Sequence, residues 1–156
     1  AMSQALANEA SDVITAVACV AMYFIGDESP NYSPIPVMEV HGLFDEIAHY
    51  SNLMATGIVF DYVLGVSDGG TSWNTGALQN LNLWKQMNEC SGLIPDRNEE
   101  SLYYNIQGFT DCTNGAEVAL VTIHAGTHDA YSGGLGNGGT VDTAQIIWDF
   151  LSKHSK

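Results

Sequence analysis

Two apolar runs in the sequence are each followed by a residue that can take part in proton transfer. The run 37–40 is followed by Asp45, and the run 118–123 is followed by His128. A neutral imidazole can remove the proton from a serine hydroxyl, and a neighbouring carboxylate fixes the imidazole tautomer and stabilises its positive charge. An aspartate in such a loop can equally cap a helix or close a turn. Asp45 and His128 are therefore candidates for the acid and the base of a catalytic triad.

A metal site is the second chemistry that these segments suggest. His41 with Asp45, and His124 with His128, have the i, i+4 spacing that places two ligands on one face of a helix. A glycine interrupts each segment and each follows a predicted strand, so we expect no metal ion and no cofactor. The histidines for which no catalytic role is expected are His49 and His124, at the surface or in packing, and the solvated His154.

Helices and strands alternate in the order of elements that the sequence predicts. The expected helices cover 1–10, 76–88 and the segment capped by Asp142, and the expected strands are 13–20, 37–40 and 118–123. The segment 26–36, with three of the four prolines, and the Gly-rich segment 132–139 are predicted loops. This order predicts an α/β fold in which a parallel sheet is flanked by helices. In such sheets functional residues gather where strands end and loops begin.

Composition and charge exclude several classes of function. The chain is 46% hydrophobic and 14% charged, which is typical of a globular domain and not of a disordered chain. Four Lys and Arg residues against 18 Asp and Glu residues give a net charge of −14, which argues against nucleic acid or an anionic membrane as a partner. No apolar run approaches the roughly 18 residues of a transmembrane helix. The acidity fits either a solvated surface or adaptation to a saline or secreted environment.

Several short motifs, spread in order over the whole chain, carry a resemblance to one family. They are the opening helix 1–13, His-Gly-x-x-Asp in 36–45, Trp-x-x-x-Asn-x-Cys in 84–90, the cysteine turn and strand 111–123, Gly-Thr-His at 126–128 and the closing segment 147–150. In these motifs the chain resembles the C-terminal part of the polyhydroxybutyrate depolymerase-like esterases. That α/β-hydrolase group also includes the feruloyl and acetylxylan esterases.

The resemblance implies a triad that this chain supplies only in part. Residues 1–156 would be the C-terminal half of a single α/β-hydrolase domain, with Asp45 as triad acid and His128 as triad base. The nucleophile would be a serine in a Gly-x-Ser-x-Gly elbow about four residues before Ala1, and the oxyanion donors would also lie upstream. Ser3 lacks flanking glycines and is not that serine. We therefore expect the 156 residues alone not to hydrolyse esters.

The resemblance also bears on the three cysteines and on the cellular compartment. It implies a disulfide between Cys90 and Cys112; the alternative is two reduced thiols in a cytosolic protein. Cys19 lies in an apolar run and is expected to be an inert buried thiol. A disulfide would imply a secreted or periplasmic protein, whose signal peptide would precede this chain.

The function that these expectations favour is a secreted serine esterase acting on a polyester or a plant-wall ester. The chain departs from the family at 129–131, where an aromatic-Pro pair is usual, and at 51–73, where the family varies, so the sequence does not choose the substrate. A second hypothesis is a non-catalytic binding protein on a degenerate hydrolase fold. A third is another α/β-hydrolase class, such as a peptidase. The exposed loop aromatics of the second hypothesis would be Trp73, Tyr103 and Tyr104.

Overall fold

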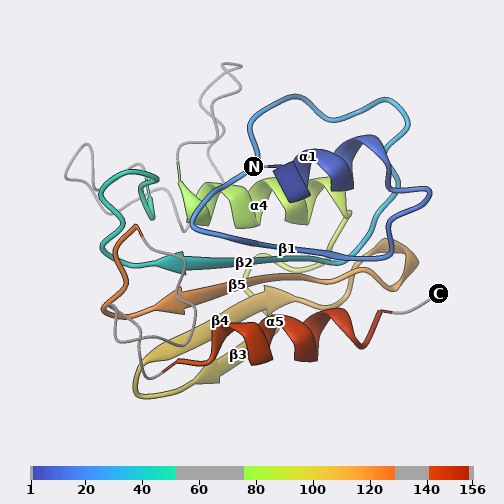
Figure 1. Ribbon diagram of the computed structural model, residues 1–156. Coiled ribbons are helices and arrows are strands. Elements are labelled where there is room, and N and C mark those ends of the chain that lie inside the picture. The colour runs from blue at the N-terminus through green and yellow to red at the C-terminus, as the bar shows by residue number, and fades with distance from the viewer. Residues whose placement is uncertain (1, 52–75, 129–140, 155–156) are drawn as a thin grey trace.

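The computed structural model describes residues 2–51, 76–128 and 141–154, and these form a five-stranded sheet with helices on both faces (Figure 1). The strand order is β1-β2-β5-β4-β3. The strands are β1 (Val17–Val20), β2 (Val37–Gly42), β3 (Arg97–Glu100), β4 (Tyr104–Phe109) and β5 (Val118–Ile123). The helices are α1 (Met2–Glu9), α4 (Ala77–Met87), the 3-10 turn η1 (Thr113–Gly115) and α5 (Thr143–Leu151).

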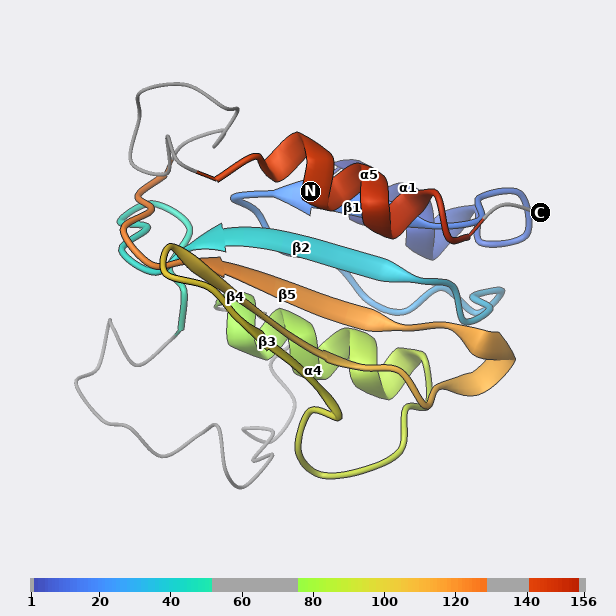
Figure 2. The same cartoon turned by 90° about the horizontal axis from the view of Figure 1, so that it is seen from below.

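The helices are divided between the two faces of the sheet. Helices α1 and α4 lie on one face, and α5 crosses the other (Figures 1 and 2). Every residue of the central strands β2 and β5 is buried, as expected for parallel strands that are covered on both faces. One apolar cluster forms around Trp84 beneath α4, and a second forms around Phe150 beneath α5. The fold is therefore a three-layer α/β arrangement.

The sheet is mixed, which corrects the expectation of a parallel sheet. Strands β1, β2 and β5 are parallel to one another, whereas β4 pairs antiparallel with β5 and β3 antiparallel with β4. Neither β3 nor β4 was expected, because β3 is wholly polar and β4 contains Gly108. That glycine is needed at its position, since a Cβ there would lie 2.5 Å from the carbonyl oxygen of Val118 on β5.

The predicted strand 13–20 is shorter than expected. The backbone N–H groups of Val13 and Ile14 both donate to the Ala10 carbonyl, so the chain turns after α1 and β1 starts only at Val17. The strand over 118–123 and the helix over 76–88 are confirmed, the helix being one residue shorter at each end. The predicted helix capped by Asp142 is also confirmed as α5. The Asp142 side chain accepts a hydrogen bond from the N–H of Gln145.

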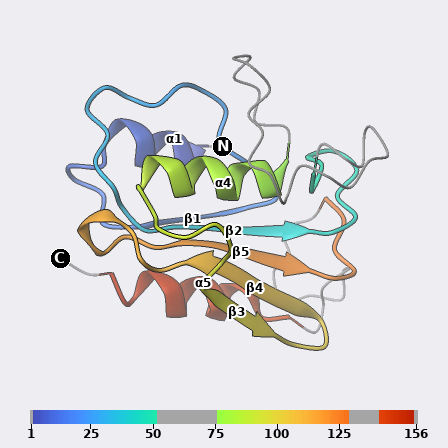
Figure 3. The same cartoon turned by 180° about the vertical axis from the view of Figure 1, so that it is seen from behind.

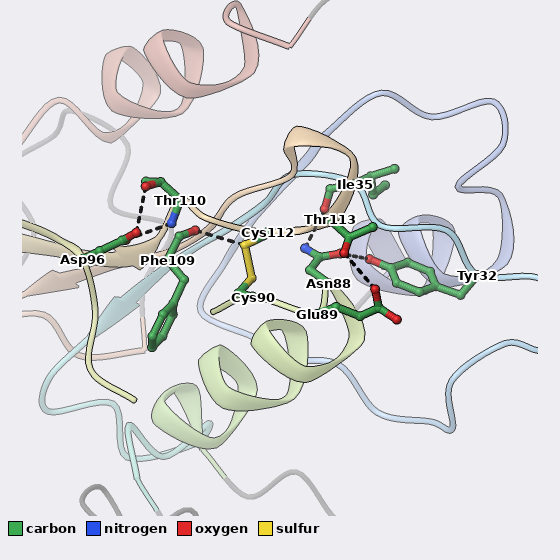
Figure 4. Close-up of a disulfide and its surroundings, with 10 residues drawn as sticks. All are labelled: Tyr32, Ile35, Asn88, Glu89, Cys90, Asp96, Phe109, Thr110, Cys112 and Thr113. Atoms are coloured by element: carbon green, nitrogen blue, oxygen red, sulfur yellow. Dashed lines mark hydrogen bonds between the residues drawn. A yellow bond between two sulfur atoms is a disulfide. The ribbon is translucent and has the colours of Figure 1, made fainter. Parts of the chain in front are cut away.

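A disulfide closes the end of the fold where α4 finishes and β5 begins (Figure 4). The predicted Cys90–Cys112 bond is present and spans 22 residues of sequence. Asn88, fully buried beside it, donates to the Ile35 carbonyl at 2.9 Å and accepts the Tyr32 hydroxyl. The bond and Asn88 together tie α4, the loop before β2 and the turn before β5 into one unit.

Candidate active site

Backbone hydrogen bonds join the loop that follows β2 to the loop that follows β5. The Leu43 N–H donates to the Ile123 carbonyl at 3.0 Å, and the Phe44 N–H donates to the Gly126 carbonyl at 2.8 Å. Figure 3 shows both loops at the same end of the sheet, where β2 and β5 have their carboxyl ends. The parallel pairing of the two strands therefore brings the two candidate site segments together.

Asp45 and His128 form a hydrogen-bonded pair at this end of the sheet. His128 Nδ1 lies 3.0 Å from Asp45 Oδ2 and 3.1 Å from Oδ1. The Asp45 side chain is completely buried, whereas the His128 side chain is 33% exposed. Asp45 Oδ1 also accepts the backbone N–H groups of Ile47 at 2.9 Å and Ala48 at 2.7 Å. The carboxylate therefore closes a turn, as one interpretation of the sequence proposed, and faces His128 as well.

The orientation of the His128 ring decides what it can do. A carboxylate offers only acceptors, so Nδ1 of His128 carries the hydrogen that lies between the two groups. In the neutral ring the lone pair is then on Nε2, the nitrogen on the far side of the ring from Asp45. An imidazole held in this tautomer is suited to take a proton from a hydroxyl group.

A second imidazole, that of His41, lies deeper in the sheet. From the sequence this residue was a candidate only for a metal ligand. His41 and Glu39 are alternate residues of β2, so their side chains share one face, and both are buried. His41 Nδ1 is 2.6 Å from Glu39 Oε1, and His41 Nε2 is 2.6 Å from the Ala48 carbonyl and 3.2 Å from Asp45 Oδ2. Asn80 of α4 donates to the other oxygen of Glu39. A glutamate inside an apolar strand was the signal for this pair, because buried carboxylates are nearly always paired.

The ionisation of this buried pair departs from that of free side chains. Burial raises the pKa of Glu39, against the opposing effects of its hydrogen bonds with His41 and Asn80. Burial by itself would lower the pKa of His41, but the hydrogen bond with Glu39 and its charge outweigh that effect, so the pKa of His41 is raised as well. Both directions mean that the pair retains a proton that free side chains would release.

The other candidate residues are not brought into this site. His124 Nδ1 lies 3.2 Å from the Leu102 carbonyl at an exposed position. His154 is not solvated as expected: its Nε2 lies 2.9 Å from Glu117 Oε1, because α5 places its end beside the turn that leads into β5. In the described ranges, no group of three or more His, Cys, Asp or Glu side chains could hold a metal ion.

The aromatic residues expected on an exposed loop differ in where the structure places them. Tyr103 is 47% exposed. Tyr104 belongs to β4 and packs against the cluster beneath α5, so its expected place in an exposed loop is wrong. Trp73 lies outside the described residues.

The sequence contains one Gly-x-Ser-x-Gly pattern, which the expectation of an upstream nucleophile did not take into account. It runs Gly65-Val-Ser67-Asp-Gly69 and lies outside the described residues. The nucleophile elbow of an α/β-hydrolase precedes the acid and the base along the chain, whereas Ser67 falls between Asp45 and His128. The pattern nevertheless makes Ser67 an alternative candidate nucleophile to a serine upstream of Ala1. The expectation that the chain alone is inactive holds only if the upstream serine is the nucleophile.

The chain was compared with known proteins. No family model matches it. It is similar to feruloyl esterase B of Piromyces equi, with 26% identity over 159 aligned positions that cover 99% of this chain. The chain is similar to an esterase.

The chain spans about a quarter of the length of that relative, since the alignment covers 25% of the feruloyl esterase. The likeness supports an esterase-like relationship. The disulfide fits an extracellular protein. Among the helices of the described ranges, none has the length and apolar character needed to cross a membrane.

Proposed function

We propose that this chain supplies the acid and the base of a serine carboxylic-ester hydrolase with an α/β-hydrolase fold. The observation that carries the proposal is the pairing of buried Asp45 with partly exposed His128 on loops after two parallel strands. The similarity to a feruloyl esterase supports the same class of reaction. Asp45 is the triad acid and His128 the triad base.

In the proposed reaction His128 moves protons and Asp45 holds its ring. His128 Nε2 takes the proton of a serine hydroxyl as the serine oxygen attacks the ester carbonyl carbon. The imidazolium then gives this proton to the leaving alcohol oxygen, and an acyl-enzyme forms. Water, deprotonated by the same nitrogen, releases the carboxylic acid and restores the serine. Throughout this cycle the carboxylate of Asp45 stabilises the positive charge of the ring.

The proposed substrate is a plant-wall ester, and the relative's name favours a feruloyl ester. A polyester is the second candidate. The enzyme is proposed to be secreted, because the Cys90–Cys112 disulfide suits an oxidising compartment. The nucleophile is proposed to be a serine that precedes Ala1, with Ser67 as the alternative.

The test uses the protein as its gene encodes it, with any residues that precede Ala1. Hydrolysis of p-nitrophenyl acetate, ethyl ferulate and a peptide amide is measured for wild type, His128→Ala and Asp45→Asn. Both esters and not the amide should be hydrolysed, and each variant should lose nearly all activity. A fluorophosphonate probe followed by mass spectrometry then identifies the modified serine, and Ser67→Ala is the matched control. Full activity in His128→Ala, or none in the wild type, would refute the proposal and favour a binding protein.

A further inference from the structure

His41 contacts both the turn that holds Asp45 and Asp45 itself. Its Nε2 is 2.6 Å from the Ala48 carbonyl, and the N–H of that same residue donates to Asp45 Oδ1 at 2.7 Å. Ala48 is thus held at its carbonyl by His41 and at its amide by Asp45. Because His41 is completely buried within β2, the central strand of the parallel part of the sheet, it connects this turn to a fully buried strand.

The protons of the pair can be counted from the acceptors around it. A carbonyl oxygen only accepts, so His41 Nε2 must carry a hydrogen. One further proton lies between His41 Nδ1 and Glu39 Oε1, 2.6 Å apart. Whether that proton is closer to the nitrogen or to the oxygen, the pair has no net charge and the Nε2–H is kept. Asn80 donates to the second oxygen of Glu39, which fixes the carboxyl group in place.

The neutrality of this pair matters because Asp45 Oδ2 is only 3.2 Å from His41 Nε2. An unpaired imidazolium at that distance would compete with His128 for the charge of Asp45. Glu39 cancels that charge, so His41 can hold the turn while the carboxylate stays available to His128. Tyr23, stacked at 6.4 Å between ring centroids, and Tyr50, edge-on at 6.3 Å, fix the plane of the His41 ring. The hydroxyl of Tyr50 is in turn bonded to Thr122 of β5.

We infer that His41, paired with Glu39, is a positioning residue for Asp45 and His128: its Nε2–H holds the Ala48 peptide, which aims the Asp45 carboxylate at His128. The effect on catalysis rests on the proposed function. The effect on the His128 ring does not depend on it, because it concerns only the hydrogen bond between His128 and Asp45.

Three conservative variants separate a hydrogen-bonding role from a packing role. The amide nitrogen of His41→Gln can reach the position of Nε2 and still donate to Ala48. The shorter side chain of His41→Asn reaches only toward Glu39 and leaves the Ala48 carbonyl without its donor. Glu39→Gln keeps a donor for His41 Nδ1 and an acceptor for Asn80, and so preserves the Nε2–H of His41.

The experiment measures the His128 ring and ester hydrolysis in the protein as its gene encodes it. Nitrogen-15 NMR of labelled histidine reports which ring nitrogen of His128 carries hydrogen, and p-nitrophenyl acetate gives kcat and KM. His41→Asn should lose the fixed Nδ1–H tautomer and about 100-fold in kcat with little change in KM, as expected for a displaced catalytic group. His41→Gln and Glu39→Gln should keep the wild-type spectrum and most of kcat.

Each result decides the inference. A folded His41→Asn variant with a wild-type His128 spectrum and wild-type kcat overturns it. Equal losses in the Asn and Gln variants also overturn it, because they would indicate packing alone. If His41→Asn does not fold, a His128 spectrum lost in folded His41→Gln overturns it and a retained one supports it. If even the wild type hydrolyses no ester, a tautomer lost only in His41→Asn still supports the inference, and the proposed function alone fails.

Discussion

The two ends of the central strands are held together by different kinds of contact. At the carboxyl ends of β2 and β5, the two loops are joined by backbone hydrogen bonds and by the Asp45–His128 pair, and the Glu39–His41 pair of β2 lies beside them. At the amino end of β5, the Cys90–Cys112 disulfide links the end of α4 to the turn before β5, and buried Asn88 beside it bonds the loop before β2 (Figure 4). The first end titrates with pH, and the second responds to reductant. Catalytic activity and the stabilisation that the disulfide provides should therefore be separable by mutation.

The largest effect is expected from His128→Ala, which removes the proposed base at the first end. Turnover of p-nitrophenyl acetate in the protein as its gene encodes it should fall by about 10⁴-fold or more. Stability should change little, because the side chain is one-third exposed. Thermal unfolding followed by circular dichroism provides the control for folding. Turnover within about tenfold of the wild type would remove His128 from the proposed triad.

The second effect belongs to the other end of the sheet. Replacing both Cys90 and Cys112 by Ala should lower the free energy of unfolding by about 3 kcal/mol, the chain-entropy value for a loop of 22 residues. Activity measured well below the unfolding temperature should be unchanged, because the bond lies away from Asp45 and His128. Reductant should destabilise the wild type to the same level and leave the double variant unaffected. A loss of activity equal to that of His128→Ala would show that the two ends are coupled.

The third effect is a dependence of stability on pH that arises from the Glu39–His41 pair at the first end. The pKa values of Glu39 and His41 are both raised, so the folded pair holds a proton that the unfolded chain releases. Such a proton stabilises the fold below the ordinary pKa of the unfolded group, and the gain is lost as pH rises. Above pH 6.5, the ordinary value for His41, the free energy of unfolding should therefore fall.

The slope of that fall is bounded by one proton, or about 1.4 kcal/mol per pH unit. Urea unfolding at a series of pH values should show it in the wild type. Glu39→Gln should flatten the slope, because it removes the carboxylate whose hydrogen bond and charge raise the pKa of His41 and so retain the extra proton. Glu99→Gln, on the exposed strand β3, is the matched control and should leave it unchanged. Identical slopes in the wild type and Glu39→Gln would contradict the shared proton.

These two ends also differ in how much the sequence reveals. Asp45 and His128 each follow a predicted strand in a short contiguous motif, and the family resemblance of such motifs implied both their pairing and that of the two cysteines. The Glu39–His41 pair depends on Asn80, which comes from α4, 41 residues further along the chain. No local pattern contains that contact.

The same limit applies to the antiparallel half of the sheet. Strand β3 has no apolar alternation because it lies at the sheet edge with its residues largely exposed. Strand β4 contains a glycine that local propensity counts against a strand, yet β5 approaches it too closely for any side chain. Edge exposure and close approach are properties of the assembled sheet, so composition and periodicity could not supply them.

The smallest effect is expected from Arg97→Ala, at the disulfide end. Arg97 Nε lies 2.6 Å from the exposed carboxylate of Glu99, and exposed ion pairs contribute less than about 1 kcal/mol. The terminal nitrogen of Arg97 lies farther, at 3.4 Å, from Glu117. Glu117 retains His154 as a partner at 2.9 Å, which reduces the loss further. A double-mutant cycle with His154→Ala measures this, because the double variant removes both ion-pair partners of a largely buried carboxylate. Its loss should exceed the sum of the single losses, and an additive result would show that the two cations do not share Glu117.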